Sequence, residues 1–87
     1  MTREELDAYS DATGIELVVA DGHDNAIVGV VRRFNDTFVL YDTEKVIKNL
    51  MADGMTHEEA VEFFEFNIVG AHVDGCPAFL EAIAEEA

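Results

Sequence analysis

The sequence predicts an α+β fold, in which a three-stranded antiparallel β-meander is packed on one face by three to four helices in the order αβββααα. Two observations lead to this fold class. The segments Thr2–Glu5 and Thr56–Glu59 match the capping box with which many helices begin. Between them lie apolar and β-branched runs separated by turn-forming residues, the pattern of a meander. Because the chain has 87 residues, 49% of them apolar, we expect a single domain that spans residues 1–87.

The first helix is expected from Arg3 to about Thr13. In its capping box, the Thr2 hydroxyl accepts a hydrogen bond from the Glu5 amide, and the Glu5 carboxylate accepts one from the Thr2 amide. Gly14 can adopt the left-handed conformation that ends such a helix. Helical spacing places three side chains on the inward face, Leu6, Tyr9 and Thr13, and three carboxylates on the outward face, Glu4, Asp7 and Asp11.

Three strands are expected next along the chain. They are the alternating run of Ile15, Leu17 and Val19, the run from Ala26 to Phe34, and the run from Thr37 to Tyr41. Turn-forming residues, Asp21–Asn25 and Asn35–Asp36, separate them. Gly29 inside the second strand indicates either a β-bulge or the close approach of a packed helix.

Three further helices are expected after the strands. Asp42 and Thr43 offer an N-cap for a helix over Glu44–Ala52, the second capping box begins a helix that runs to about Asn67, and Pro77 can occupy the first position of a short final helix. The side chains expected in the core are Val46, Ile47, Leu50 and Met51 of the first, Ala60, Val61 and Phe64 of the second, with Phe63 left open, and Phe79, Ala82 and Ile83 of the third.

The charge of the chain excludes several classes of partner. Nineteen acidic residues against five Lys and Arg give a formal net charge of −14. Such an excess argues against direct binding to nucleic acid or to anionic lipid, so a large partner surface should be basic. A compact domain of 87 residues is roughly 30 Å across, and 30 Å of B-DNA carries about 18 phosphate charges. The net charge of −14 is of the same order.

The cysteine content and the apolar runs indicate a compartment. Cys76 is a single cysteine and forms no internal disulfide, and no N-terminal segment resembles a secretion signal. The longest apolar stretch, residues 26–31, is far too short to span a membrane. We therefore expect a protein of a reducing cytoplasm without membrane contact. We favour a monomer.

A row of carboxylates is predicted on the helix that begins at the second capping box. Glu58, Glu62 and Glu65 follow i, i+4, i+7 spacing, so they lie close together around the helix. Each like-charge pair costs the helix roughly 0.2–0.5 kcal/mol, and no lysine is interleaved. Two interpretations stay open: a solvated face, or an electrostatic surface for a basic partner. For the second, the expected binding residues are Glu58, Glu62 and Glu65, with Asp53 and Glu59 beside them and Glu4, Asp7 and Asp11 as a second row without a neighbouring base.

No motif predicts catalysis, a metal or a cofactor. The loop Asp21–Asn25 fails the EF-hand spacing because Arg32 stands at its twelfth position. His72 and Cys76 are four residues apart, but neighbouring Gly75 and Pro77 break the helix that would align them. His23 and His57 are interpreted as a turn residue and a solvated residue of a first helical turn.

Phe66 has two interpretations. It is either an exposed anchor on the acidic side of its helix or a residue packed under the segment from Gly70 to Cys76. The packed arrangement is favoured, because aromatic side chains at helical spacing more often belong to a core.

Three stretches of the sequence resemble a pattern common in small uncharacterised proteins of bacteriophages and prophages. They are Tyr41–Ile47, Asp53–Ala60 and Phe63–Ala71, and Asp24–Val30 also fits. The chain departs from this pattern at Cys76, where a polar residue is usual, and in its longer acidic tail. Among such proteins, a strongly acidic member is similar to the phage anti-CRISPR proteins, several of which act as DNA mimics against type I surveillance complexes.

The expected function is therefore that of a phage-encoded inhibitor, an anti-CRISPR protein that occupies a basic nucleic-acid-binding groove of a host surveillance complex and blocks target DNA. The alternative is a phage accessory module that modulates another host enzyme without catalytic activity of its own. An enzyme, the third class, requires a cleft that contains a carboxylate with a perturbed pKa.

Overall fold

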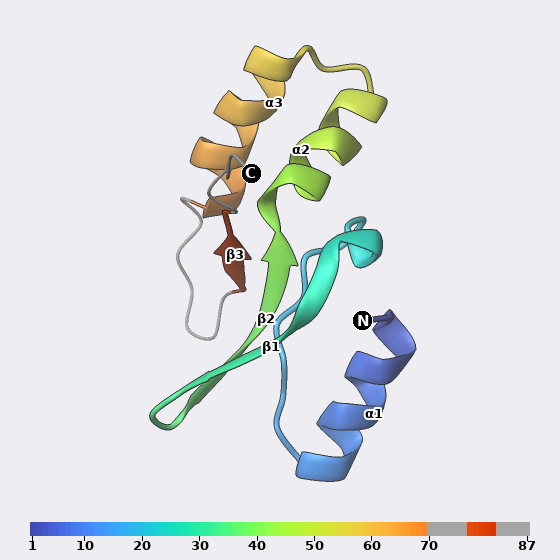
Figure 1. Ribbon diagram of the computed structural model, residues 1–87, viewed down its shortest axis with the longest axis vertical. Helices are drawn as coiled ribbons and strands as arrows, with labels where there is room; N and C mark the ends of the chain where they lie inside the picture. The colour runs from blue at the N-terminus through green and yellow to red at the C-terminus, as the bar shows by residue number, and fades with distance from the viewer. Residues whose placement is uncertain (70–76, 82–87) are drawn as a thin grey trace, which may run out of the picture.

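A computed structural model describes residues 1–69 and 77–81 of the chain (Figure 1). Its elements, in chain order, are α1 (Arg3–Thr13), the 3₁₀ turn η1 (Asp24–Ala26), β1 (Ile27–Arg33), β2 (Asp36–Asp42), α2 (Thr43–Ala52), α3 (His57–Phe63), the π-helical turn η2 (Phe64–Val69) and β3 (Ala78–Leu80). The fold is α+β, as the sequence predicts, with three α-helices and a three-stranded sheet among the described residues.

The sheet is mixed, and this corrects the predicted antiparallel meander. Its order is β1-β2-β3; β1 pairs with β2 antiparallel as predicted, whereas β3 pairs with β2 parallel. The predicted strand at Ile15–Val19 is wrong, because residues 15–20 form no ladder. Leu17 and Val19 instead pack against the core, so their alternation reflects one-sided burial without strand pairing.

The short helix predicted after Pro77 is also wrong over the described residues 78–80, which form β3. Phe79 explains the difference. Its ring stacks on Tyr41 of β2 at a centroid distance of 6.0 Å and meets Phe64 edge-on at 5.1 Å. Proline is as compatible with the start of a strand as with the first turn of a helix, so Pro77 alone does not decide between them. The aromatic contacts of Phe79 accompany the pairing of β3 with β2. Ala82 and Ile83 lie outside the described residues.

The three α-helices begin at the predicted caps. Both capping boxes form: the Thr2 hydroxyl accepts from the Glu5 amide at 3.1 Å, and the Thr56 hydroxyl accepts from the Glu59 amide at 3.2 Å. Asp42 caps α2 by accepting from the Glu44 amide at 3.0 Å. The predicted α-helix to Asn67 is correct only as far as Phe63, since the next six residues form the π-helical turn η2.

Two glycines have the structural roles that the sequence suggests for them. Gly14 ends α1 with a φ of 75°, in the left-handed region. At Gly29 the register between β1 and β2 shifts, which is a β-bulge. A Cβ built at Gly29 meets no atom within 4 Å, so the bulge, and not a close helix approach, accounts for this position.

The core joins the strands to the helices, and it includes one fully buried side chain from α1, Leu6. The buried apolar residues are Leu6, Ala26, Ile27, Val39, Tyr41, Val46, Ile47, Leu50, Ala60 and Phe64. Two residues expected on inward faces, Thr13 and Met51, are exposed, whereas Tyr9, Val61 and Phe79 are half-buried. Phe63, which was left open, is exposed.

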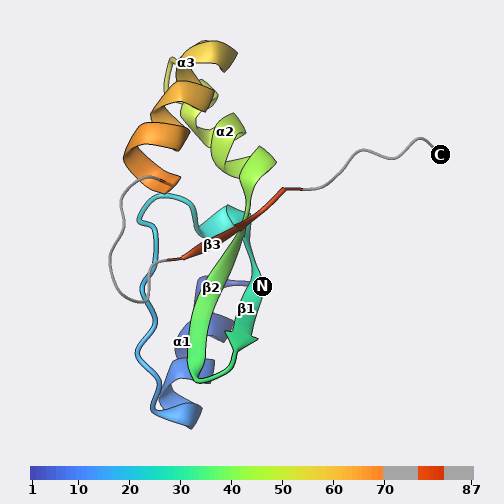
Figure 2. The ribbon, with the colours of Figure 1, turned by 90° about the vertical axis from the view of Figure 1, so that its left-hand side faces the viewer.

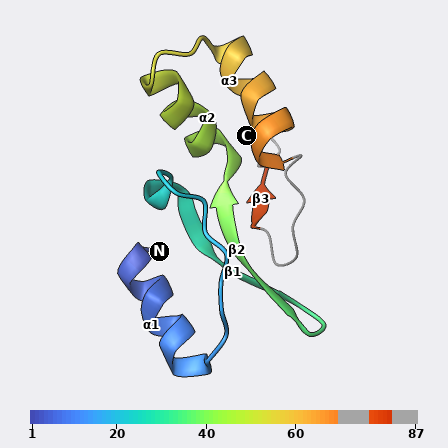
Figure 3. The same ribbon diagram turned by 180° about the vertical axis from the view of Figure 1, so that it is seen from behind.

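The helices lie in two places. In Figures 1 and 3, α1 lies beside the β1–β2 hairpin at one end of the long axis, whereas α2 and α3 form an antiparallel pair at the other end. The same separation appears after a 90° turn (Figure 2). This arrangement accounts for a radius of gyration of 13.7 Å, larger than the ~12 Å of a compact chain of this length.

Candidate functional site

The carboxylates predicted to bind a partner divide into two groups. The α3 acidic surface comprises Asp53, Glu58, Glu59, Glu62 and Glu65, all of them exposed. The α1 row comprises Glu4, Asp7 and Asp11, also exposed. Since α1 and α3 lie at opposite ends of the molecule (Figures 1 and 3), these are two separate groups.

The α3 acidic surface carries uncompensated charge. Within residues 1–69 and 77–81, none of its members forms an ion pair, and the two ion pairs found there both involve Arg3. Glu58 lies in the first turn of α3, where the helix dipole favours a negative charge. Glu59 lies in the same first turn.

The row within this surface is less regular than the sequence predicts. Glu58 and Glu62 are one α-helical turn apart, whereas the step from Glu62 to Glu65 crosses from α3 into η2. Since a π-helical turn closes i to i+5 hydrogen bonds, it is wider than an α-helical turn and rotates Glu65 away from ideal spacing. Glu65 therefore extends the surface without strictly continuing the row.

Glu59 differs from its neighbours because it has a structural partner. One of its carboxylate oxygens accepts a hydrogen bond from the Thr56 amide at 2.9 Å. This bond belongs to the capping box and holds the side chain close to the start of α3. Asp53, another member of the surface, is the C-cap residue of α2, and its backbone amide donates to carbonyl oxygens of the last turn of that helix.

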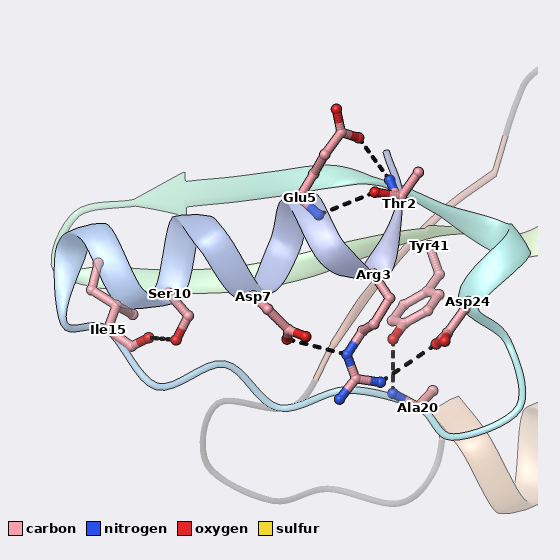
Figure 4. A network of polar contacts seen from close by, with 9 residues as sticks. All are labelled: Thr2, Arg3, Glu5, Asp7, Ser10, Ile15, Ala20, Asp24 and Tyr41. Atoms are coloured by element: carbon pink, nitrogen blue, oxygen red, sulfur yellow. Dashed lines mark hydrogen bonds and ion pairs between the residues drawn. The ribbon is translucent and has the colours of Figure 1, made fainter.

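The α1 row is partly neutralised, and the prediction that its members lack a neighbouring base is wrong for Asp7. The Arg3 Nε donates to an Asp7 oxygen at 3.3 Å, and Arg3 Nη1 lies 3.5 Å from an Asp24 oxygen (Figure 4). The hydrogen bond with Asp7 is the main reason that the pKa of Arg3 lies above its usual value. Arg3 thus ties α1 to η1 and reduces the charge of this end.

A groove lies along the same side of α3 as part of the acidic surface. We call it the Phe66 groove; it has a volume of about 410 Å³ and is lined by Met55, Glu59, Glu62, Phe63, Phe66 and Asn67. Phe66 is 75% exposed, and the segment from Gly70 to Cys76, under which the packed interpretation places it, lies outside the described residues. The sequence contains a signal for this groove. Glu62, Phe63 and Phe66 lie three, four and seven residues after Glu59, which is the spacing of one helix face.

A second hollow, of about 500 Å³, lies between residues 19–23, the end of α2 and β3. Apolar side chains such as Leu50, Ile68 and Phe79 form much of its wall, and Phe63 and Asn67 border both hollows. Asp21 and His23 are the titratable residues in the described lining. The hollow lies beside the core, without a pair of facing carboxylates among those residues.

His23 is buried, which corrects its interpretation as a simple turn residue. Asn49 of α2 donates from Nδ2 to the His23 Nδ1 at 3.0 Å, and its side-chain amide also exchanges two hydrogen bonds with the amide of Asn25, at 2.8 and 3.0 Å. These contacts attach η1 to α2. By contrast, His57 is exposed in the first turn of α3, as predicted.

The described residues contain neither a metal-binding cluster nor a membrane-spanning helix. In residues 1–69 and 77–81, no group of three or more His, Cys, Asp or Glu side chains could hold a metal ion. Over the same ranges, none of the helices has the length and apolar character needed to cross a bilayer. His72 and Cys76, which the sequence analysis considered as a metal pair, lie outside the described residues.

Comparisons with known proteins add no relative. No family model matches the chain, and neither a curated protein nor a solved structure is significantly similar to it.

Proposed function

We propose that this protein is a non-catalytic acidic inhibitor that uses the α3 acidic surface to occupy a basic nucleic-acid-binding groove of a host defence complex. A CRISPR surveillance complex is the proposed target, on the basis of the sequence resemblance described above. The observation that carries the proposal is the α3 acidic surface itself: five exposed carboxylates without an ion pair among the described residues.

The packing of the helix pair supports this proposal. A surface that replaces a DNA backbone must hold its charges in place, since charges on a flexible segment lose conformational entropy on binding. The α3 acidic surface lies on helices whose inner sides bury Leu50, Ala60 and Phe64. Carboxylates on such a support can present charge to a basic groove at little ordering cost.

A charge-reversal experiment tests the proposal. The triple variant Glu58→Lys, Glu62→Lys and Glu65→Lys retains Glu59 and therefore the capping box. We expect it to abolish inhibition of target-duplex binding by a purified type I surveillance complex, measured by mobility shift. A single Glu62→Gln change should weaken inhibition only a few-fold, because one exposed ion pair contributes about 0.2–1 kcal/mol.

The matched control reverses three charges at the other end of the molecule, Glu4→Lys, Asp11→Lys and Glu16→Lys. Both variants change the net charge by the same amount, so only the location of the charge differs. We expect the control to inhibit better than the α3 variant. Equal inhibition by both variants and the wild type, with helices intact by circular dichroism, would leave the α3 acidic surface as a solvated face.

Raising the salt concentration tests the electrostatic part. The Debye length falls from about 10 Å at 0.1 M to about 3 Å at 1 M, so inhibition by the wild type should weaken.

A pull-down from host lysate separates this proposal from the alternative of an accessory module, because it identifies the partner directly. Recovery of another host enzyme, without surveillance-complex subunits, would favour the accessory module.

A further inference from the structure

The Phe66 groove combines an apolar floor with an acidic rim. Phe66 and Phe63, which are 75% and 38% exposed, line it together with Met55. The carboxylates of Glu59 and Glu62 border the same hollow. A partner that covers Phe66 and the exposed part of Phe63 would gain free energy from removing this apolar surface from water.

The chemistry of the rim and floor selects one kind of occupant. A purely apolar side chain would leave the two carboxylates partly desolvated without a counter-charge, and a nucleic acid or a lipid phosphate would be repelled by them. A cation with a planar apolar surface satisfies both parts, because it can stack on an aromatic face and donate hydrogen bonds from its edge to the carboxylates. Arginine has this form, whereas the strongly hydrated ammonium of lysine does not stack in the same way.

We infer that the Phe66 groove binds an arginine side chain of a basic partner protein, with the guanidinium stacked on Phe66 and held by the carboxylates of Glu59 and Glu62. This inference rests on the proposed function and deepens it, because it names the anchor through which the acidic surface recognises its partner. General charge attraction then brings the partner close, and the groove determines how the two proteins dock.

The spacing within α3 and η2 supports a common site. Glu59, Glu62 and Phe63 lie at i, i+3 and i+4 within α3 and so share one side of the helix, and Phe66 follows in the wider turn η2 and lines the same groove. The hydrogen bond from the Thr56 amide holds Glu59 at the rim through one oxygen. The four side chains and Met55 thus surround one hollow and need no rearrangement of the backbone.

The test uses three short peptides as probes: acetyl-Gly-Arg-Gly-amide and its lysine and citrulline counterparts. Citrulline keeps the planar shape of arginine without its charge. We expect NMR titration of the full chain to show the largest shifts at Met55, Phe63 and Phe66 with the arginine peptide, smaller shifts with lysine, and none with citrulline.

Two variants locate the site. Phe66→Ala should weaken the arginine peptide roughly two- to fivefold, the range for loss of one exposed cation–π contact. The control is Phe34→Ala, because Phe34 is 89% exposed at the turn between β1 and β2, far along the chain from the groove. This control should leave the affinity unchanged, and both variants should fold because neither ring is buried.

The outcomes separate the inference from the proposed function. Peptide shifts at the groove that are lost in Phe66→Ala support the inference, whatever the result of the mobility-shift assay. Binding that the triple Glu58, Glu62, Glu65 reversal removes but Phe66→Ala leaves unchanged would overturn the inference and leave the proposed function standing. Equal binding of the arginine and citrulline peptides would overturn it as well.

Discussion

The two ends of the molecule begin from the same local device and are held in different ways. Both α1 and α3 start with a Thr-x-x-Glu capping box and carry exposed carboxylates. The α2–α3 end is held by apolar burial, through residues such as Leu50, Ala60 and Phe64. The α1 end buries only Leu6 fully from its own helix, and it depends more on polar contacts.

Those polar contacts at the α1 end reach across the chain (Figure 4). Arg3 pairs with Asp24, the N-terminal ammonium donates to the Ile27 carbonyl oxygen at 3.3 Å, and the Ala20 amide donates to the Tyr41 hydroxyl at 2.8 Å. The comparison teaches that one arginine partly compensates the acidity of the α1 end, whereas the α3 acidic surface has no ion pair among the described residues.

The largest expected effect is at the apolar end. Phe64→Ala should reduce the free energy of unfolding by about 3–5 kcal/mol, because it removes a fully buried ring of η2 that packs against Phe79 of β3. For a domain of this size, with a total of roughly 4–13 kcal/mol, that is a large fraction. Urea denaturation measures it. The neighbouring variant Phe63→Ala, at an exposed position, should cost less than about 1 kcal/mol, and equal losses would contradict the assigned core.

Tyr41→Phe tests the polar fastening of the segment before η1. Losing the hydroxyl leaves the Ala20 amide without its acceptor and should cost about 1–2 kcal/mol near neutral pH. Burial raises the pKa of Tyr41 above its ordinary value of 10.0, so the folded state keeps the proton that the unfolded state loses. The wild type should therefore keep its full stability below pH 10 and lose stability as the pH rises through the raised pKa.

The variant lacks this titration, so the stability difference between wild type and Tyr41→Phe should narrow from pH 9 to pH 11. Urea midpoints at several pH values provide the measurement. A gap that stays constant over this range would contradict the buried position of the hydroxyl.

The two capping boxes allow a direct comparison of the ends. Thr2→Ala and Thr56→Ala should each cost about 0.5–2 kcal/mol. We expect hydrogen exchange to show local fraying of α1 in the first variant and a broader loss of protection in the second, because α3 continues directly into η2, whose Phe64 is buried against Phe79 of β3. The control variants Thr2→Ser and Thr56→Ser keep the hydroxyl and should exchange like the wild type. If both alanine variants lost protection over the same residues, the proposed difference between the two ends would be contradicted.

The box of α1 also has a pH limit. The hydrogen bond from the Thr2 amide is the main cause that lowers the pKa of Glu5 below 4.5. Its stabilisation is therefore complete above that value and is lost as the pH falls through the lowered pKa.

The smallest expected effect is that of Arg3→Gln. Exposed ion pairs contribute about 0–1 kcal/mol, so the variant should change the unfolding free energy within that range, and less at 1 M salt than at 0.1 M. Lys48→Gln is the control, because Lys48 is exposed and forms no ion pair in the part of the chain that the structure describes. A loss at Arg3 above 2 kcal/mol that persists in high salt would show that packing of its stem, and not its charge, holds the α1 end.

Local features of the chain could be predicted from the sequence alone. The capping boxes, the N-cap at Asp42, the left-handed Gly14 and the β1–β2 hairpin all depend on residues within a few positions of one another. Hydrogen bonds between neighbours have the same partners in almost any fold, so residue type and spacing suffice to predict them. The −14 charge and the acidic character of α3 are likewise properties of composition.

Only the tertiary structure decided which distant segments meet. Residues 15–20 and 78–80 both have apolar patterns, but the second pairs with β2 because Phe79 fits between Tyr41 and Phe64. The hydrogen bond between Asn49 and the buried His23 and the exposure of Phe66 also depend on surroundings beyond the local pattern. The Arg3–Asp7 ion pair does not, because its i, i+4 spacing within α1 could have been predicted from the sequence. Packing selects one arrangement among several that the local patterns allow, because the free energy of burial depends on the whole neighbourhood of a side chain.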